Sequence, residues 1–290
     1  MSALDRLPAD THPFILTLSC VDRPGIVHAV SGAIAGAGGN IIQSQQFGDT
    51  DTGLFFMRVE ADLPGGESVF RERMAALGAE FGMSWTLDRR GRPIRTVIMV
   101  SKEGHCLSDL LFRQRSRHLP LDIVAVVGNH ADLAPLAEFY GVPFVHLPVT
   151  PETKAGAEAA LLDLVERENV ELVVLARYMQ ILSDTLCERM SGRIINIHHS
   201  FLPSFKGARP YAQAYARGVK LMGATAHYVT ADLDEGPIIE QDVTRITHAD
   251  SVAAMVQQGQ DVERRVLAQA VTWHAEHRVL LNGHRTVVFR

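Results

Sequence analysis

The sequence of 290 residues has few cysteines and lacks long apolar runs. Cys20, Cys106 and Cys187 are odd in number and show no CxxC spacing, which predicts neither a disulfide framework nor a structural zinc site. No apolar run approaches the roughly 20 residues that span a bilayer. Residues 1–12 contain no basic segment followed by an apolar core, so we expect no secretory signal. These absences predict a cytoplasmic protein without a membrane partner.

Basic residues are not clustered either. The formal net charge is -5, and the densest basic segment is the short stretch Asp88–Arg92. This distribution argues against nucleic acid as a partner. With 47% hydrophobic and 21% charged residues, the chain has the composition of a globular protein that is long enough for two domains. We therefore expect its ligand to be a small molecule.

A charged segment that contains glycine and proline, Asp88–Arg95, separates two regions of different periodicity. Before it, the spacing of apolar residues predicts the order βαββαβ, a ferredoxin-like fold whose exposed sheet edges favour self-association. We expect a small domain over 1–88, a linker over 89–95 and a larger domain over 96–290. In the small domain, strands are expected over 14–19, 40–47, 54–61 and 83–87, and helices over 26–37 and around 70–77.

The larger domain alternates strands and helices, which predicts an α/β fold with a doubly wound, mostly parallel, Rossmann-like sheet. Open sheets of this kind bind ligands at the carboxyl ends of their strands. We expect strands over 96–100, 122–127, 144–147, 171–175, 193–198, 223–229 and 237–243, and helices over 105–117, 131–140, 152–168 and from about 251.

The segment Arg193–Gly207 carries the most informative pattern in the chain. Its isoleucine-rich start predicts a buried central strand, and the proline and glycine that follow predict a loop. Asn196 and His198 are two residues apart, so in an extended strand they point to the same side and offer an amide donor and a titratable imidazole. A structural histidine is the alternative. The loop context favours a catalytic pair that stabilises a developing oxyanion.

An acidic loop follows the predicted strand 223–229. It offers Asp232, Asp234 and Glu235, and Gly236–Pro237 predicts a sharp reversal of the chain. An acidic loop alone is most often only solvated, so its functional interpretation depends on the Asn-x-His pair of the neighbouring strand.

Between the first strand and helix of the small domain lie Asp22, Gly25 and Ile26, and Asn40 and Ile41 open the next strand. This pattern resembles ACT domains, regulatory modules that commonly bind amino acids at domain interfaces. Free amides at the helix start are suited to meeting a carboxylate. The resemblance implies glycine or methionine as an effector and a homo-oligomer, a tetramer or hexamer, built through this domain. The alternative is a module that only oligomerises.

The Asn-x-His pair and the Asp-x-Gly loop together resemble the catalytic domain of folate-dependent formyltransferases, whose roles map onto Asn196, His198 and Asp234. With the ACT-like module, nearly the whole chain is similar to the formyltetrahydrofolate deformylases. The segments that carry this similarity are His198–Pro203, Gly207–Tyr211 and Gly223–Tyr228.

The deformylase resemblance implies hydrolysis of 10-formyltetrahydrofolate to formate and tetrahydrofolate. The formate would feed purine synthesis, and the reaction would balance the one-carbon folate pools. No group of His, Cys or Asp has the spacing of metal ligands, so we expect no metal and no cofactor besides the folate substrate.

The loop Arg177–Leu182 follows the predicted strand 171–175 and resembles the family segment that holds the pterin. The resemblance implies that its backbone groups bind the edge of the pterin, and a plain strand-to-helix connection is the alternative. The folate-binding residues implied are Arg177, Tyr178, Met179, Gln180, Ile181, Leu182 and Thr230.

One departure from the transferases concerns the formyl acceptor. Glycinamide ribonucleotide formyltransferases carry a glycine-rich loop that cradles the phosphate of the acceptor. Here the corresponding segment is Ser101–Cys106, in which Glu103 adds negative charge and only Gly104 remains of the glycine pair. This departure favours water as the acceptor. A transferase with another amine acceptor and a non-catalytic folate or amino-acid sensor are the alternatives.

In the expected mechanism, the formyl oxygen meets the Asn196 amide and the His198 imidazole, which stabilise its developing charge. Asp234 is expected to orient water and accept its proton, or to hold His198 protonated. Two further histidines have open roles. His199, where the transferases usually carry proline, either orders water or packs, and His227 either supports Asp234 or belongs to the core.

Overall fold

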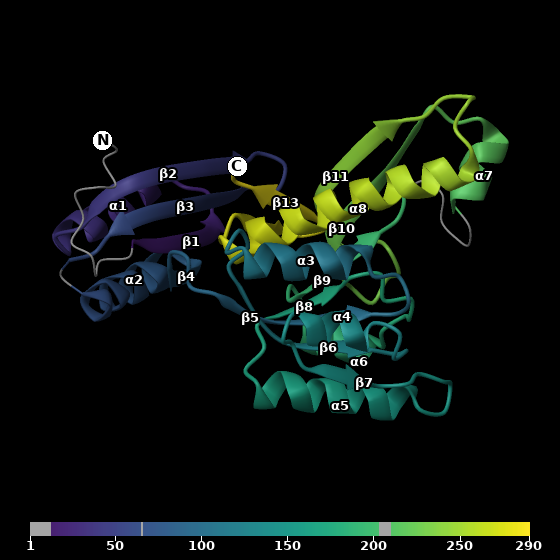
Figure 1. The fold of residues 1–290 in the computed structure, drawn as a ribbon. Coiled ribbons are helices and arrows are strands. Elements are labelled where there is room, and N and C mark those ends of the chain that lie inside the picture. The colour runs from purple at the N-terminus through teal and green to yellow at the C-terminus, as the bar shows by residue number, and fades with distance from the viewer. Residues whose placement is uncertain (1–12, 65, 203–209) are drawn as a thin grey trace. The chain divides into compact units, whose positions relative to one another are not determined.

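The computed structural model describes residues 13–64, 66–202 and 210–290, and these residues form two compact units (Figure 1). The first unit holds the described residues up to 92 together with 276–282 and 287–290. The second unit holds the described residues of 93–275 together with 283–286. The change between the units at 92 and 93 falls inside the charged segment around which the linker is expected. Two C-terminal segments, 276–282 and 287–290, also group with the first unit, and the expected domain ranges do not include this feature.

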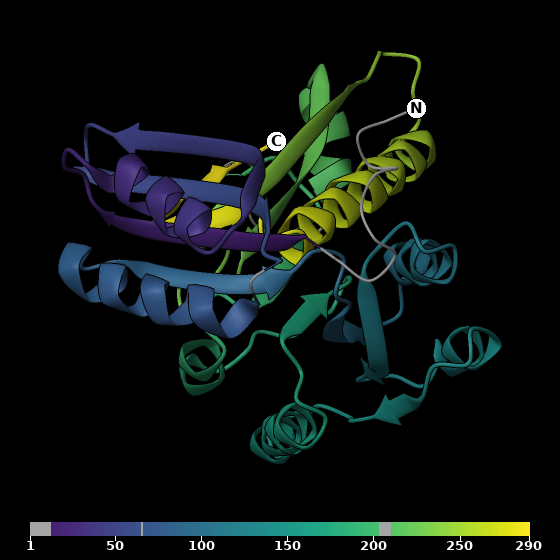
Figure 2. The same ribbon diagram turned by 90° about the vertical axis from the view of Figure 1, so that its left-hand side faces the viewer.

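The first unit has the predicted βαββαβ order. Its antiparallel sheet has the strand order β2-β3-β1-β4, and buried residues of both helices and of the strands share one core (Figure 2). Successive side chains of a strand point to opposite faces of the sheet, which explains this packing. Leu16 and Leu18 of β1 point into the core, while Thr17 between them pairs with Thr86 across the sheet. The elements are β1 (Phe14–Val21), α1 (Ile26–Gly36), β2 (Asn40–Asp49), β3 (Leu54–Asp62), α2 (Glu67–Phe81) and β4 (Ser84–Arg89).

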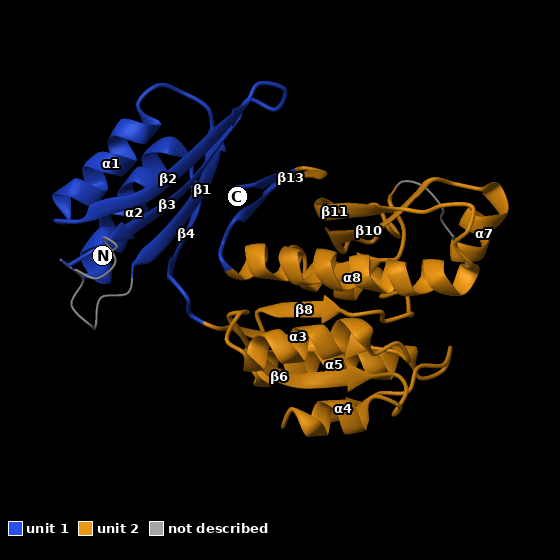
Figure 3. Cartoon of the chain, turned by 45° about the horizontal axis from the view of Figure 1, so that its top comes forward, with its two compact units in different colours: residues 1–92, 276–282, 287–290 blue, residues 93–275, 283–286 orange. Residues whose placement is uncertain are grey.

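The end of the chain forms a small hairpin, β12 (Val279–Asn282) and β13 (Arg285–Val288), which the sequence did not reveal. Figure 3 shows the C-terminal end in the colour of the first unit. The Nδ2 of Asn282 donates to the Oδ2 of Asp49 at 2.6 Å, and the guanidinium of Arg58 donates to the carbonyl oxygen of Glu276 at 3.1 and 3.3 Å. These bonds attach the C-terminal segment to β2 and β3.

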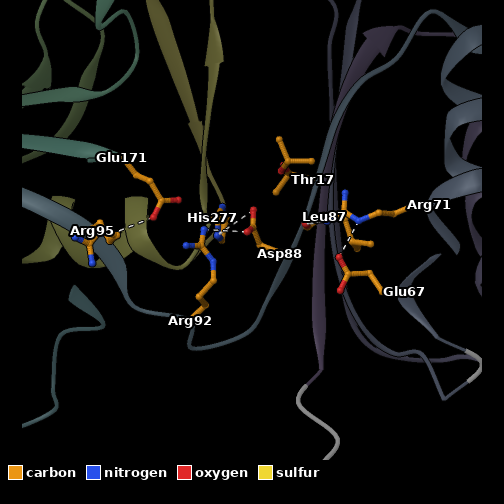
Figure 4. A network of polar contacts seen from close by, with 10 residues as sticks. Thr17, Glu67, Arg71, Leu87, Asp88, Arg92, Arg95, Glu171 and His277 are labelled. Atoms are coloured by element: carbon orange, nitrogen blue, oxygen red, sulfur yellow. Dashed lines mark hydrogen bonds and ion pairs between the residues drawn. The ribbon is translucent and has the colours of Figure 1, made fainter. Parts of the chain in front are cut away.

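Polar contacts hold the segment expected as the linker at both of its ends (Figure 4). The Nη2 of Arg92 donates to the Oδ1 of Asp88 at 3.0 Å, and His277 lies 3.7 Å from the other oxygen of Asp88. The backbone amide of Arg95 donates to the carboxylate of Glu171 at 3.2 Å. The start of this segment is therefore tied to the first unit and its end to the second.

The second unit contains the predicted mostly parallel sheet, in the strand order β11-β10-β9-β8-β5-β6-β7. The strands from β9 to β7 are parallel, and β10 and β11 continue the sheet in antiparallel pairing. The strands are β5 (Ile94–Val100), β6 (Leu121–Gly128), β7 (Phe144–His146), β8 (Leu172–Leu175), β9 (Ile194–His198), β10 (Leu221–Tyr228) and β11 (Ile238–Arg245).

The helices of the second unit include two that the sequence did not predict, α6 (Asp184–Arg189) and α7 (Pro210–Arg217). Both are too short to show a clear helical period. The long C-terminal helix buries the predicted face of Val262, Val266, Ala270 and Trp273. The remaining helices are α3 (His105–Arg115), α4 (Ala134–Phe139), α5 (Lys154–Arg167) and α8 (Val252–Ala275).

The position of β5 between β6 and β8 marks the point where the strand order reverses. In an open sheet, the crevice at the carboxyl ends of the strands around such a point is the usual ligand site. Ser101, Arg177 and His199 lie just beyond the ends of β5, β8 and β9. In the described part of the chain, no helix has both the length and the apolar character needed to cross a bilayer.

The attachment of the C-terminal segment generates a stability prediction. Asn282→Ala removes the side-chain donor to the Oδ2 of the buried Asp49 carboxylate, and loss of such a bond costs about 1–3 kcal/mol. Urea unfolding followed by a probe in the first unit measures this loss. Gln46→Ala, a change at an exposed position of β2, is the control and should leave the unfolding midpoint unchanged. Equal midpoints for both variants would contradict the role of this bond.

Candidate active site

A cavity of about 260 Å³ opens at the carboxyl ends of the strands in the second unit. The expected catalytic residues Asn196, His198 and Asp234 all line it. So do all six residues of the expected folate loop Arg177–Leu182, and Thr230, which follows β10. Residues that are far apart in the sequence are thus brought together in one cavity.

His198 and Asp234 form the central contact of the cavity. The Nδ1 of His198 lies 3.2 Å from the Oδ1 of Asp234, and both side chains are mostly buried. The hydrogen bond from His198 holds the pKa of Asp234 below its ordinary value, although burial acts in the opposite direction. Asp234 is therefore an anion at neutral pH. Among the described residues, the buried Nε2 of His198 has no partner, which leaves this nitrogen for a ligand.

Asn196 is oriented by His227 of the adjacent strand. The Nδ1 of His227 lies 2.9 Å from the carbonyl oxygen of Tyr228, which can only accept, so we assign the proton to Nδ1. The bare Nε2 then accepts from the Nδ2 of Asn196 at 3.2 Å. Burial lowers the pKa of His227, in keeping with a neutral ring. Two roles were left open for His227, support of Asp234 and packing in the core. The geometry adds a third role, orientation of Asn196, because His227 forms its hydrogen bond with Asn196 while Asp234 lies 3.8 Å away.

The loop that carries Asp234 turns back tightly against the end of β10. Asp234 has a left-handed backbone with φ 58°. A Cβ placed on Gly236 would lie 1.7 Å from the carbonyl oxygen of Tyr228, so only glycine fits there. Asp232 and Glu235 are exposed in the same loop, whereas Asp234 is turned toward His198.

The folate loop is held by a residue that the sequence did not single out for this purpose. The hydroxyl of Ser101, at the end of β5, accepts from the backbone amide of Met179 at 2.9 Å and donates to the Oδ1 of Asn129 at 2.7 Å. The sequence signal that could have identified Ser101 is its position just after a predicted parallel strand. Ser101 is buried, and through Met179 it fixes the loop that lines the cavity.

A second buried hydroxyl, that of Thr225 in β10, holds the segment that follows β9. It accepts from the amide of Leu202 at 3.1 Å and donates to the carbonyl oxygen of Ser200 at 3.0 Å. Gln241 of β11 adds a hydrogen bond to Thr225 at 2.9 Å. This network positions the backbone immediately after His198 and His199.

The chain is similar to known proteins over nearly its whole length. Residues 94–271 match the family model of the formyl transferases, and residues 14–78 match that of the ACT domain. The formyltetrahydrofolate deformylase of Corynebacterium sp. (strain P-1) is 49% identical over 95% of this chain and 98% of its own. The chain belongs to the formyltetrahydrofolate deformylase family.

Solved structures give the same relationship. A formyltetrahydrofolate deformylase from Pseudomonas syringae pv. tomato matches with a TM-score of 0.94 and 46% identity, covering 99% of this chain and 97% of that one. A glycinamide ribonucleotide transformylase 1 from Symbiobacterium toebii is less similar, with a TM-score of 0.65 and 31% identity over 71% of this chain and 98% of that one. Both the fold and the two-part organisation are thus those of the deformylase family.

This member of the deformylase family has a second buried carboxylate near the cavity. Glu263 of α8 accepts from the Nε2 of His105 at 2.8 Å and from the hydroxyl of Tyr211 at 2.6 Å, and the Nε of Arg177 lies 3.5 Å away. Burial raises the pKa of Glu263, but the hydrogen bond from His105 and the charge of Arg177 outweigh burial and lower it overall. A Cβ on Gly259 would overlap the Tyr211 hydroxyl, so this glycine makes room for the contact.

His105, Cys106 and Glu263 bring potential metal-ligand atoms within 4.8 Å of one another, which the sequence spacing did not reveal. Two observations disfavour a cation there. Burial raises the pKa of the Cys106 thiol, and the guanidinium of Arg177 already compensates the charge of Glu263. The expectation that no metal is required stays a prediction, and it is in keeping with this chemistry.

His199 lies at the cavity wall between two rings. It stacks on His198 with a centroid distance of 5.4 Å and lies 6.3 Å from the ring of Tyr211. Burial and the nearby charge of Arg177 lower the pKa of His199 to about 4, so the ring is neutral at physiological pH. Both roles expected for His199, ordering water and packing, suit a neutral ring at this place.

The expected effector residues of the ACT-like unit do not form one group within the chain. Asp22 and Gly25 follow the end of β1, which pairs with Leu54 at the start of β3. Asn40 pairs with Asp62 at the other end of β3, roughly 25 Å away at the ordinary rise of a strand. Ile41 packs against the core, and Ile26, which is buried in it, has no side-chain surface for a ligand.

The His198 contact generates a prediction about pH. Because the folded pKa of Asp234 is depressed, the stability that this contact contributes is complete above the unfolded value of about 3.9 and is lost as the pH falls through the folded value. Titration of the Asp234 carboxyl by ¹³C NMR should give a pKa below about 3.9. In His198→Asn the pKa should rise, and an unchanged pKa in that variant would contradict the assigned contact.

Proposed function

We propose that this chain hydrolyses 10-formyltetrahydrofolate to formate and tetrahydrofolate. The observation that carries the proposal is the convergence of Asn196, His198 and Asp234 in one cavity with the loop 177–182, in a member of the deformylase family. The formate would feed purine synthesis, and the reaction would balance the one-carbon folate pools. The residue roles below belong to the same proposal.

The developing oxyanion is stabilised by Asn196 and His198. One amide hydrogen of Asn196 is used by His227, which leaves the other for the formyl oxygen. The Nε2 of His198 is the second donor when the ring is protonated. Because both groups are fixed before the substrate binds, they require little reorganisation as charge develops.

Asp234 acts through its contact with the Nδ1 of His198. Of the two roles expected for it, the 3.2 Å contact supports the one in which the Asp234 anion holds His198 protonated. Water adds to the formyl carbon, and the bond from that carbon to N10 then breaks. One proton of the water must reach N10, and the His198–Asp234 pair is the titratable group placed to transfer it. The other proton is released when the formic acid ionises to formate.

Several observations support a hydrolase over a transferase that uses an amine. The chain is closer to the Pseudomonas syringae deformylase than to the Symbiobacterium toebii transformylase in both identity and TM-score. Two polar side chains of the segment Ser101–Cys106 are also engaged within the chain, since Glu103 accepts from Gln260 at 3.4 Å and His105 donates to Glu263. A non-catalytic sensor would not need the complete set of Asn196, His198 and Asp234.

Regulation and assembly form a further part of the proposal. The ACT-domain match supports an amino-acid effector, for which glycine and methionine are the candidates. Asp22 and Asn40 lie at opposite ends of the sheet in one chain, so a site that used both would need a second copy. This requirement suits a homo-oligomer, a tetramer or hexamer, formed through the first unit. The composition supports a cytoplasmic location.

The proposed function is tested by incubating the purified chain with 10-formyltetrahydrofolate and no amine acceptor. We expect formate and tetrahydrofolate to form in equal amounts, at a rate that an added amine does not raise. Glycine and methionine are then titrated into the same assay. Product formation that depended on an amine would indicate the transferase, and folate binding without product would indicate the sensor.

Replacement of Asp234 tests the roles in the mechanism. Asp234→Asn removes the anion that holds His198, so kcat should fall by about 10²–10⁴-fold while the dissociation constant of tetrahydrofolate stays nearly constant. Asp232→Asn removes a neighbouring exposed carboxylate of the same loop and is the matched control. An equal loss of binding and rate in Asp234→Asn would refute the assignment.

A further inference from the structure

Arg177 places a buried positive charge beside the reaction cavity. It lies two residues beyond the end of β8, has a left-handed backbone with φ 65°, and lines the cavity together with His198 and His199. Its side chain is only 14% exposed. The expected role of this residue used only the backbone of the folate loop, so the guanidinium is left without a function.

The guanidinium has unused donors. Among the described residues, its buried Nε and Nη1 have no hydrogen-bond acceptor. The Nε lies 3.5 Å from the Oε2 of Glu263, which compensates the charge without forming a hydrogen bond. Buried donors of this kind are rarely left without a hydrogen bond, because an unpaired buried donor carries the full free-energy cost of removing the group from water. The arrangement therefore calls for an acceptor that arrives with a ligand.

Glu263 holds the guanidinium in place but is not that acceptor. Its two oxygens already accept from the Nε2 of His105 and the hydroxyl of Tyr211. These partners come from α3 and α7, so together with the loop of Arg177 three separate segments meet at one carboxylate of α8. A guanidinium fixed in this way is ready for a ligand before the ligand arrives.

A carboxylate is the ligand whose shape and charge match a guanidinium best. In the proposed reaction, the neutral formyl group gives rise to one new anion, formate, next to Asn196 and His198. The neighbouring His199 does not compete for this anion as a cation, since the charge of Arg177 contributes to keeping its ring neutral. The chemistry of the product thus matches the unused donors of this cavity-lining residue.

We propose that the Arg177 guanidinium, fixed by Glu263, is the binding site for the formate carboxylate. The inference rests on the proposed function, because hydrolysis is what produces formate in this cavity. Arg177 binds the product after the bond to N10 has broken, and it has a weaker interaction with the neutral formyl group. Formate is therefore a product inhibitor that depends on this one side chain.

The experiment measures inhibition by sodium formate, with sodium chloride at equal ionic strength as the reference. In Arg177→Gln the inhibition constant of formate should rise by roughly 10-fold or more, as expected for loss of a charge-assisted bond. Arg177→Lys keeps the charge and loses the planar fork, so its inhibition constant for formate should lie between those of the parent chain and Arg177→Gln. Inhibition by tetrahydrofolate should not change. Arg113→Gln, which removes an ion pair on α3, is the control and should behave as the parent chain.

Arg177→Gln leaves the buried Glu263 without its cation, which endangers folding. The double variant Arg177→Gln with Glu263→Gln removes both charges and provides a second test with the same expected loss of formate inhibition. Binding of ¹³C-formate is also followed directly by NMR line broadening, which needs no turnover. Loss of broadening in both variants supports the site.

Other outcomes overturn the inference. Formate that binds the parent chain and the Arg177 variants equally excludes Arg177 as its site. Weaker binding of tetrahydrofolate with unchanged formate binding would assign the guanidinium to a carboxylate of the folate tail. If the parent chain releases no formate from its substrate, the proposed function fails, and the NMR measurement still decides whether Arg177 binds a carboxylate.

Discussion

The antiparallel register between β9 and β10 places Asn196 opposite His227 and His198 opposite Thr225. Much of the site follows from this pairing. His227 is in reach of the Asn196 amide, Thr225 holds the backbone after His198, and the loop after β10 returns over the strand end through Gly236. A shift of one residue would turn each of these side chains to the other face of the sheet.

Two carboxylates near the cavity remain ionised for different reasons. Asp234 is stabilised by one hydrogen bond from His198. Glu263 is much more deeply buried, and it stays charged because His105 and Tyr211 donate to it while Arg177 balances its charge. Groups with such different surroundings are suited to different work. In our proposals Asp234 assists proton transfer, and Glu263 only fixes the position of a cation.

Local patterns in the sequence were sufficient for most of the fold and for the Asn-x-His pair. The apolar run of β9 places Asn196 and His198 at a strand end, whereas Asp234 and the folate loop were recognised through the resemblance to the formyltransferases. The contacts of Glu263 were not, because His105 lies 158 residues away and nothing local in α8 marks a polar junction. The hairpin β12–β13 was missed since its two strands are only four residues each. The effector residues share a family motif, but the register of β3 separates them within one chain.

The chain crosses between the two compact units more than once. It leaves the first unit after residue 92, re-enters it at 276, and changes unit again on both sides of 283–286. A gene fragment that ended at residue 92 would therefore encode a small unit without Asn282 and Glu276, the partners of Asp49 and Arg58. Recombination at a single point cannot exchange this unit intact. A replacement would have to bring its own C-terminal tail.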